Sequence, residues 1–414
     1  MTDSRGKAGN SPYRVGLFGF LGPGNSGNEA SMETVLAYLR RDHPGVAVDA
    51  MSDGAGHLRA RHGIDAVSLY PDMDDTRPAG RLTRYLGKIS GKVSDNLRVI
   101  SWVRKHDAVI VPGAGVLEAT TPLRPWGFPL SFCLCFAAGR LSGVKLALVS
   151  VGASPISVKA TRWLSNTTAR CASYRSYRDA QSLTVMRERG VDTSQDRVFP
   201  DLAFAFPEPP YDPGDPELVG VGVMDYYGTN DDRARAEELH SAYLEKMTVF
   251  IEWLVDNGFS VRLFGGDGRV DYVIAEDIRK DVYSRRPDLA PARIGIDAYS
   301  SYAELLDKIN KVGTVVATRY HNVLAGVRLG KPTIALAYSE KFIALMDGIG
   351  LSDYYQRADS LDTGQLIRQF TEARERRVQL REMMAKYNAA NAETLGRQFV
   401  LLSEQLGFPK DSSR

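Results

Sequence analysis

The sequence lacks several features that are typical of particular classes of protein. Only three of its 414 residues are cysteines, Cys133, Cys135 and Cys171. Because their number is odd and the close pair lies in an apolar segment, we expect buried, reduced thiols rather than a disulfide framework. The longest stretch without a charged residue, residues 125–139, is shorter than the roughly 20 residues that span a bilayer. No transmembrane helix is therefore predicted.

The chain also lacks an excess of charge. Its 52 Lys and Arg side chains balance 50 Asp and Glu, for a net charge of +2, whereas nucleic-acid binding calls for a basic surface. Residues 1–12 are polar and lack the apolar core of a signal peptide. We therefore expect a disordered tail, a cytoplasmic location and no nucleic-acid partner. No group of His, Cys or carboxylate residues has metal-ligand spacing, so neither a metal nor a cofactor is expected.

What remains is an ordinary globular composition with a strongly alternating pattern. From residue 13, β-branched runs alternate with helical segments, which predicts βαβ units and a mostly parallel sheet. The expected strands are Arg14–Phe20, Val46–Met51, Asp65–Tyr70, Ala108–Pro112, Lys145–Val151, Tyr174–Arg178, Val198–Phe206, Val219–Met224, Val261–Gly265, Arg293–Ile296, Thr314–Thr318 and Thr333–Tyr338. Between the first two strands, apolar residues recur with helical spacing at Met32, Val35, Leu36 and Leu39.

A proline-rich segment, residues 207–217, divides this pattern, and no regular element is expected within it. We predict a Rossmann-like domain over 13–206 and a second over 218–360. A helical tail over 361–414 can cross back to the first domain. Ligands of doubly wound folds bind at the carboxyl ends of the strands, so function is expected in a central cleft between two such domains.

The first turn between strand and helix is rich in glycine. Its spacing matches GxGxxG at Gly22, Gly24 and Gly27. Such a turn can place its backbone amides around an anion or a substrate. It can also bind a dinucleotide, with Asp49 or Asp53 contacting the ribose. A third interpretation is a tight turn with no ligand. The polar residues beside it are Asn25, Asn28 and Glu29. They are unusual for a pyrophosphate turn and favour the first interpretation.

A second cluster follows the later strands. Arg319 and His321 come after one predicted strand and Lys341 after the next, so all three are expected at the carboxyl edge of the second sheet. Arginine and lysine bind phosphate or carboxylate, and histidine transfers protons near neutral pH. The remaining histidines, His43, His57, His62, His106 and His240, are interpreted as structural.

Two further segments carry charged residues. Arg178 ends a predicted strand where it can face a ligand, Arg175 lies on the opposite pleat, and Asp179 is the expected helix cap. A salt bridge is the alternative for both arginines. Residues 81–105 combine a basic and an apolar helical stripe. They can either cover the sheet or make peripheral contact with an anionic membrane.

These segments together resemble the polysaccharide pyruvyl transferase family over nearly the whole chain. The matching pieces are GPGNSGNEA, VIVPGAGVLE, the run Ser176 to Asp179, FPDLAF with Asp201, and ATRYHNVLAGVRLGKPTIALAYSEKF. The resemblance implies a GT-B-like fold and transfer of the enolpyruvyl unit of phosphoenolpyruvate to a saccharide acceptor, lipid-linked or not, with closure to a ketal. Where the family commonly has aspartate in the first turn, this chain has Asn28, and an amide is no base.

The resulting hypothesis assigns phosphoenolpyruvate to Arg178, Arg319 and Lys341, and proton transfer to His321. Glu29 and the loop containing Gly24, Asn25, Gly27 and Asn28 would orient the acceptor. The alternatives are a glycosyltransferase using a nucleotide sugar, a nicotinamide oxidoreductase, and a noncatalytic sugar-binding relative.

Overall fold

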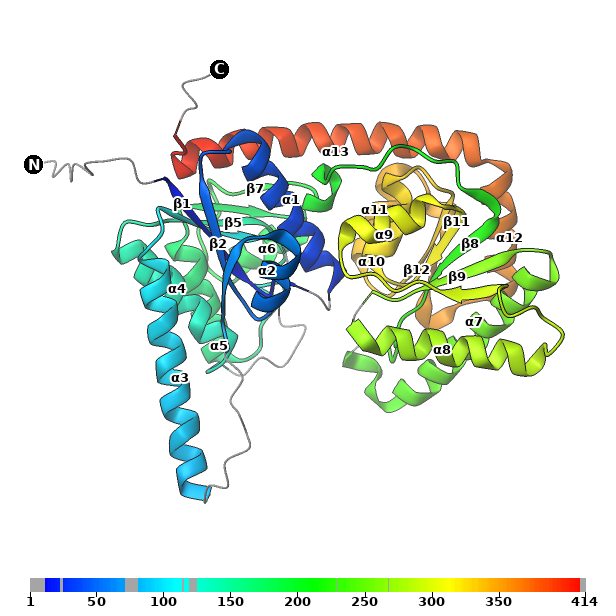
Figure 1. Ribbon diagram of the computed structural model, residues 1–414, viewed down its shortest axis with the longest axis horizontal. Coiled ribbons are helices and arrows are strands. Elements are labelled where there is room, and N and C mark those ends of the chain that lie inside the picture. Colours follow the sequence, from blue (N-terminus) through cyan, green and yellow to red (C-terminus); the bar gives the residue numbers. More distant parts are fainter. Residues whose placement is uncertain are drawn as a thin grey trace, which may run out of the picture. The chain divides into compact units, whose positions relative to one another are not determined.

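The computed structural model describes residues 12–22, 25–70, 81–113, 115–118, 125–228, 230–266 and 268–409 (Figure 1). For residues 81–90, 230, 231, 233, 268 and 269 it describes the backbone alone. Residues 1–11 of the predicted tail, and Gly24, lie outside the described residues.

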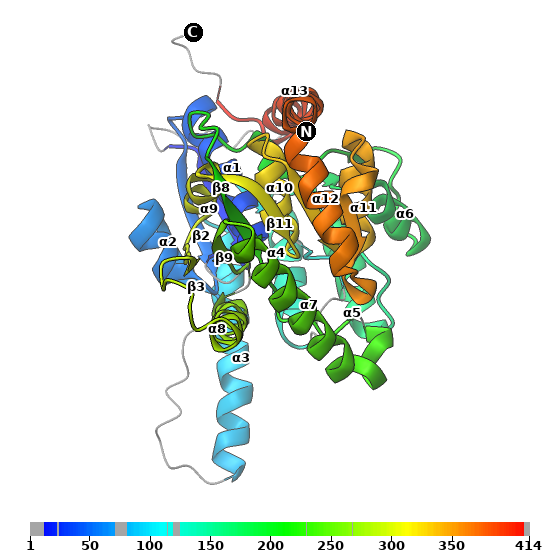
Figure 2. The same cartoon turned by 90° about the vertical axis from the view of Figure 1, so that its right-hand side faces the viewer.

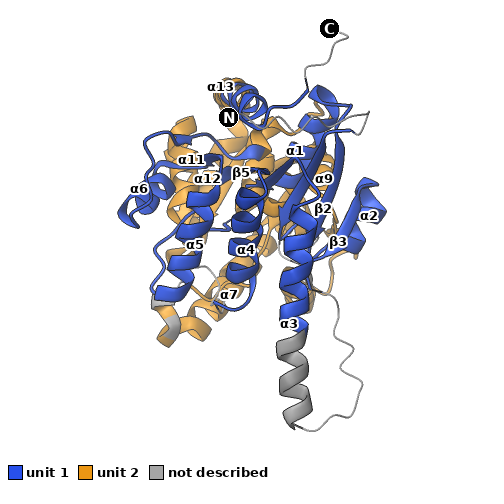
Figure 3. Ribbon diagram, turned by 90° about the vertical axis from the view of Figure 1, so that its left-hand side faces the viewer, with its two compact units in different colours: residues 1–22, 31–202, 394–414 blue, residues 23–30, 203–393 orange. Residues whose placement is uncertain are grey.

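The chain forms two compact units, coloured separately in Figure 3. Unit 1 comprises residues 1–22, 31–202 and 394–414, and unit 2 comprises residues 23–30 and 203–393. The short segment 23–30, which contains most of the predicted first-turn loop, thus belongs to unit 2 although the strand before it belongs to unit 1.

Unit 1 is built on a parallel sheet of seven strands in the order β3-β2-β1-β4-β5-β6-β7. The strands are β1 Arg14–Gly19, β2 Ala47–Ser52, β3 Asp65–Ser68, β4 Ala108–Pro112, β5 Lys145–Val151, β6 Tyr174–Tyr177 and β7 Arg197–Val198. The helices are α1 Ser26–Asp42, α2 Ala55–His62, α3 Arg81–Val103, α4 Phe128–Leu141, α5 Lys159–Cys171 and α6 Ala180–Glu188. The α/β fold class is confirmed.

The burial of apolar side chains explains why unit 1 has the strands and helices that its sequence pattern predicts. Strand β4 is buried at every position, as expected for a central parallel strand. The predicted α1 stripe, Met32, Val35, Leu36 and Leu39, is at most 2% exposed. The predicted strand Val198–Phe206 is wrong beyond its first residue, because Leu202–Ala205 forms a short 3₁₀ helix that buries its apolar side chains locally.

All three cysteines are free thiols in unit 1, with Cys133 and Cys135 buried and Cys171 partly buried. Burial raises the pKa of each thiol, so the neutral form dominates and reactivity is low. The sequence-based expectation of reduced, inert thiols holds.

Unit 2 contains a second parallel sheet, of six strands in the order β10-β9-β8-β11-β12-β13. The strands are β8 Asp215–Gly222, β9 Ser260–Phe264, β10 Ile294–Ile296, β11 Val312–Ala317, β12 Thr333–Ala337 and β13 Tyr355–Arg357. The helices are α7 Ala236–Asp256, α8 Gly268–Arg285, α9 Tyr302–Asn310, α10 Tyr320–Arg328, α11 Glu340–Ile349, α12 Thr363–Glu375 and α13 Arg377–Leu406. Helices α12 and α7 pack together, as Figure 2 shows.

Two details of unit 2 differ from expectation. Strand β8 begins at Asp215, inside the segment predicted to hold no regular element, because pairing with β11 stabilises its first residues. Strand β13 was not predicted. Its three residues include no run of β-branched side chains, so their local strand propensity is low. The strand forms because these residues pair with β12.

The proline-rich segment is fixed to unit 2 by buried cations. Arg328 donates to the Phe206 carbonyl and the Glu208 carboxylate, and Lys331, which is 2% exposed, donates to the carbonyl of Asp212 at 2.7 Å. Burial lowers the pKa of Lys331 to about 8. These contacts bind the segment to the fold instead of leaving it as a free tether.

Helix α13 contributes residues to both units. Within unit 1, the fully buried Gln398 donates to the hydroxyls of Ser150 and Ser176 at 3.0 and 2.8 Å. Tyr13 donates to the carbonyl of Leu406. These hydrogen bonds attach the end of the chain to the first sheet.

Helix α3 contains the segment predicted to be basic and amphipathic, but its first ten side chains lie outside those described. Membrane contact by residues 81–105 therefore stays a prediction. Among the described residues, no helix combines the length and the apolarity needed to cross a bilayer.

A partly buried charge cluster supports the first sheet. The Asp49 carboxylate accepts hydrogen bonds from Trp102 Nε1 at 2.8 Å and from Arg14 Nη2 at 3.0 Å, and lies 2.9 Å from His106 Nε2. The other ring nitrogen of His106 faces the Trp102 carbonyl at 2.9 Å. Each ring nitrogen of His106 thus faces an acceptor, the Asp49 carboxylate or the Trp102 carbonyl. Both can receive a hydrogen bond only when each ring nitrogen carries a proton.

The cluster makes stability depend on pH. Burial alone raises the pKa of Asp49, but the hydrogen bond and charge of His106, with Arg14 and Trp102, outweigh it and lower the pKa below its ordinary value. A depressed carboxyl pKa adds stability above the unfolded value of about 3.9, and this is lost as pH falls through the folded value. Asp49→Asn should therefore lower the melting temperature at pH 7, by about 1–3 kcal/mol of unfolding free energy, and the gap to the parent should narrow below pH 4. A gap independent of pH would contradict this assignment.

Candidate functional site

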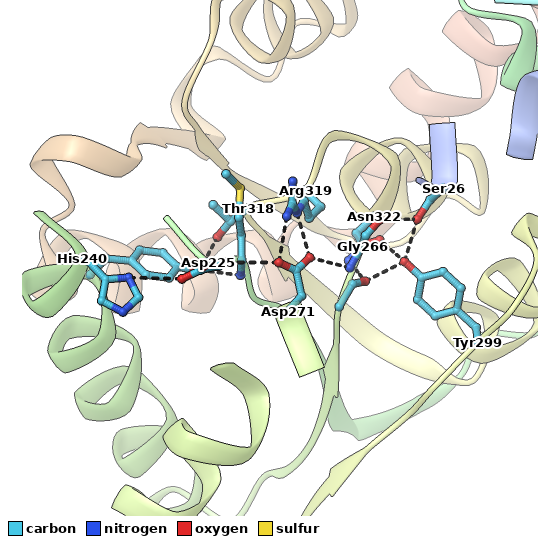
Figure 4. A network of polar contacts seen from close by, with 12 residues as sticks. Ser26, Asp225, His240, Gly266, Asp271, Tyr299, Thr318, Arg319 and Asn322 are labelled. Atoms are coloured by element: carbon cyan, nitrogen blue, oxygen red, sulfur yellow. Dashed lines mark hydrogen bonds and ion pairs between the residues drawn. The ribbon is translucent and has the colours of Figure 1, made fainter. Parts of the chain in front are cut away.

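The carboxyl edge of the unit 2 sheet gathers polar residues from several loops. Strands β8, β9 and β11 lie side by side and end at Gly222, Phe264 and Ala317. The segments that follow them hold most of the polar network drawn in Figure 4. In a parallel sheet this edge is where ligands bind.

Asp271 is the centre of that network. It is fully buried in the first turn of α8 and accepts hydrogen bonds from Arg319 Nε and Nη2, both at 2.8 Å. The backbone amides of Gly266 and Asp225 donate to the same carboxylate at 2.8 and 3.1 Å. Figure 4 shows the carboxylate between these donors. A bidentate ion pair of this kind fixes the plane of the guanidinium.

Gly266 allows this arrangement. A Cβ atom there would lie 2.5 Å from the Cγ of Arg319, so any side chain would displace the arginine. The Arg319 side chain stays about one fifth exposed. Arg319 is thus held in one orientation on the carboxyl edge of the sheet while part of it remains accessible.

The segment 25–30 is anchored to the same edge. Ser26 donates from its hydroxyl to the Gly266 carbonyl at 2.9 Å and lies 2.9 Å from the Tyr299 hydroxyl. Asn322 donates to the Gly265 carbonyl at 3.1 Å. Burial raises the pKa of Tyr299 well above its usual range, so this phenol stays protonated and can donate. The start of α1 is therefore part of the unit 2 site.

Gly27 and His321, two predicted site residues, lie in direct contact. A Cβ atom at Gly27 would come within 2.2 Å of His321 Cε1 and within 2.9 Å of both ring nitrogens. His321 is the second residue of α10, and Tyr320 packs edge-on against it with ring centroids 5.2 Å apart. Glycine is needed here for close approach rather than for a special backbone angle.

Gly27→Ala should consequently displace the imidazole. A methyl group at 2.2 Å is far inside van der Waals contact, so we expect catalytic activity to fall at least about tenfold while the fold survives, because α1 tolerates alanine well. The control is Gly45→Ala, since nothing lies within 4 Å of a Cβ there. Activity and melting temperature of both variants provide the comparison. Equal activity in the two would disprove the close approach.

Lys341 belongs to the next loop, at the start of α11. Its ammonium lies 4.9 Å from the ring centroid of Tyr320 and 5.8 Å from that of Tyr338. Such cation–π contacts hold the charge near the residue that flanks His321. The structure thus brings Arg319, His321 and Lys341 together in unit 2; their roles in phosphoenolpyruvate binding and proton transfer stay predictions.

The first-turn residues have distinct surroundings. Glu29 is 3% exposed in the first turn of α1. Asn25 caps this helix, because its Oδ1 accepts from the amides of Gly27 and Asn28 at 3.0 and 3.2 Å. Asn28 itself is partly exposed. The side-chain oxygen of Asn25 is thus occupied in capping the helix, a role that composition did not indicate.

Arg178 belongs to unit 1. It forms an ion pair with Glu118, from the loop after β4, and its Nε lies 3.5 Å from Asp179. Asp179 caps α6 as predicted, accepting from the Ser182 amide at 2.6 Å. Arg175 pairs with Asp196, which is the salt bridge considered for it. The assignment of Arg178 to donor binding stays a prediction.

The acids proposed for a dinucleotide ribose have other contacts in unit 1. Asp49 is engaged by His106, Trp102 and Arg14 as described above, and Asp53 accepts from the Ser52 hydroxyl and the Gly54 amide. A Cβ at Gly22 would lie 2.9 Å from the Cα of Gly54. The turn at Gly22 packs closely against the turn at Gly54. This contact accounts for glycine at position 22, and no bound nucleotide is needed to explain it.

Sequence reasoning missed most of the network, including Asp271, Tyr299 and Ser26. Asp271 follows a strand and a Gly-Gly pair, a signal that could have marked it. Tyr299 stands in a loop with no such pattern, and only the folded chain brings its hydroxyl to Ser26.

Comparison with known proteins identifies the fold class first. The chain is 13% identical to UDP-GlcNAc 2-epimerase from Neisseria meningitidis bound to UDP-GlcNAc, with a TM-score of 0.57 over 94% of this chain and 99% of that one. It is 12% identical to Anabaena HepE in complex with UDP and glucose, with a TM-score of 0.58 over 95% and 99%. A putative UDP-N-acetylglucosamine 2-epimerase from Listeria monocytogenes is also 12% identical, with a TM-score of 0.59 over 97% and 98%. The fold is therefore that of the GT-B-like enzymes.

The sequence gives the family. The profile of the polysaccharide pyruvyl transferases matches residues 25–340, a range that runs from the cap of α1 to the start of α11 and includes Arg319 and His321. The chain belongs to the polysaccharide pyruvyl transferase family. No curated protein sequence matches it significantly.

Proposed function

We propose that this protein transfers the enolpyruvyl unit of phosphoenolpyruvate to a saccharide and closes it into a pyruvate ketal. Family membership supports a transferase of polysaccharide biosynthesis. The observation that carries the donor assignment is the oriented Arg319 beside His321 and Lys341 in unit 2. Two cations suit a ligand with both a phosphate and a carboxylate.

In the proposed mechanism, Arg319 and Lys341 bind the anionic groups of the donor. His321 protonates C3, which generates positive character at C2, and a saccharide hydroxyl attacks C2. The C2–O bond to phosphate breaks, and a second hydroxyl of the same saccharide closes the ketal. Of the two hydroxyl protons, one replaces the proton given by His321 and the other leaves with phosphate. General acid catalysis of this kind contributes roughly 10² to 10⁴ in rate.

Glu29 is assigned to the acceptor. It lies two residues after Gly27, which packs on His321, and its carboxylate is buried in the same unit. In place of the aspartate common in the family at residue 28, Glu29 would orient the attacking hydroxyl and take its proton. The reaction as written requires no metal and no cofactor, and the acceptor is a saccharide, lipid-linked or free.

A nucleotide-sugar glycosyltransferase is the second candidate, because two of the similar structures were solved with UDP-GlcNAc or with UDP and glucose bound. The test measures thermal stability against phosphoenolpyruvate, UDP-GlcNAc, UDP-glucose and NADH. A ligand at 100 times its Kd should add about 2.7 kcal/mol. Stabilisation by phosphoenolpyruvate that is lost in Arg319→Gln supports the proposal.

Stabilisation by a nucleotide sugar alone would favour the second candidate and overturn the donor assignment, and NADH alone would indicate an oxidoreductase. Phosphate release with a panel of saccharides, followed by ³¹P NMR, then identifies the acceptor. Tight phosphoenolpyruvate binding without release with any acceptor would indicate a noncatalytic relative.

A further inference from the structure

Unit 1 carries a pocket that the proposed function does not use. It has a volume of about 340 Å³ and is lined by Pro155, Ile156, Arg162, Val185, Glu188 and Arg189. These residues come from the loop after β5, from α5 and from the end of α6, all in unit 1 (Figure 3). The volume is at the lower end of the range for small-molecule sites.

Arg189 gives the pocket its charge. Its Nε donates to Asn166 Oδ1 at 3.0 Å and its Nη2 to the Ser165 hydroxyl at 2.6 Å. Its Nη1 donates to the carbonyls of Leu117 and Ser154 at 3.1 and 3.4 Å. All four acceptors are neutral, whereas a guanidinium has five N–H groups and a full positive charge. The protein holds this cation rigidly and does not neutralise it through these contacts.

A second cation stands beside it. Arg162 is exposed in the first turn of α5 and lines the same pocket. Burial lowers the pKa of Arg189 to about 10, and the charge of Arg162 acts in the same direction. Arg189 remains protonated at neutral pH, so two positive side chains line one pocket.

We propose that this pocket binds an organic phosphate. A phosphate dianion matches the two positive charges, and arginine recognises its oxygens by charge-assisted hydrogen bonds. The apolar side chains of Pro155, Ile156 and Val185 would contact the organic part. Glu188, which is exposed, also lines the pocket. This inference goes beyond the proposed function and stands without it.

The test uses the full chain with three probes: inorganic phosphate, glucose 1-phosphate and glucose. Trp163, the neighbour of Arg162 on α5, is 62% exposed and reports binding by fluorescence; Trp163→Phe identifies its signal, and calorimetry gives the affinity. Glucose 1-phosphate should bind more tightly than phosphate, and glucose should not bind. Arg162→Gln should weaken binding at least about tenfold, as expected for hydrogen bonds to a charged group.

Arg140→Gln, on the exposed surface of α4, should leave the affinity unchanged and is the matched control. Arg319→Gln in unit 2 should also leave it unchanged, which separates this pocket from the proposed donor site. Arg189→Gln can be compared if its melting temperature stays close to the parent value. Phosphate binding that survives both Arg162→Gln and Arg189→Gln would overturn the proposal.

Vesicles of phosphatidylglycerol distinguish a lipid headgroup from a soluble phosphate. Cosedimentation with vesicles, together with no binding of glucose 1-phosphate, would overturn the pocket as a small-molecule site. Binding of glucose 1-phosphate that vesicles do not compete away supports it.

Discussion

His321→Gln should lower kcat by about 10² to 10⁴ while changing the KM for phosphoenolpyruvate little, because glutamine fills similar space but does not transfer a proton at neutral pH. The ring is positioned for this role by Gly27 on one side and Tyr320 on the other. Steady-state kinetics with phosphoenolpyruvate and an acceptor, once one is identified, give the two constants separately.

The matched control is His43→Gln, directly after α1 in unit 1, whose ring lies 3.1 Å from the Tyr38 hydroxyl and 3.0 Å from the Ser403 hydroxyl. It should retain parental kcat. A His321→Gln variant with kcat close to the parent would rule out His321 as the general acid and leave the fold and the family unaffected.

Asp271→Ala should have the largest effect on stability. Removing one partner of a buried ion pair leaves the other charge uncompensated and costs about 3–5 kcal/mol. Here the carboxylate also accepts from the Gly266 and Asp225 amides, so two partly buried backbone donors lose their acceptor as well. Urea denaturation measures the change in unfolding free energy.

The same variant should weaken phosphoenolpyruvate binding, since Arg319 would lose the contact that fixes its orientation. Asp277→Ala is the control on the same helix. Asp277 is exposed and pairs with Lys280 at 3.4 Å, an interaction worth about 0.3–0.5 kcal/mol. If the two variants were equally stable, Asp271 would not be the centre of the network.

The effect at His321 was predicted from its position after a strand, whereas the effect at Asp271 was not. The Gly-Gly pair before Asp271 marks a turn, but the importance of this residue comes from its complete burial opposite an arginine 48 positions later. Two segments 240 residues apart likewise meet when Ser26 donates to Gly266. Contacts of such separation depend on strand order, which local patterns do not encode.

The sequence by itself determined the alternation of strands and helices, because apolar periodicity follows from which face of each element is buried. It also determined the family, through the match over residues 25–340. The helix cap at Asp179 was likewise readable, since capping is a local hydrogen bond.

Only the tertiary structure decided the partners of these residues. It gave Arg319 a buried carboxylate, placed Gly27 against His321, and left Arg189 among neutral acceptors beside a pocket. It also turned the predicted strand after Val198 into a 3₁₀ helix and recruited Tyr355–Arg357 as an edge strand. The physical reason is that burial and pairing are set by elements distant in the chain, which outweigh the weak local preferences of a few residues.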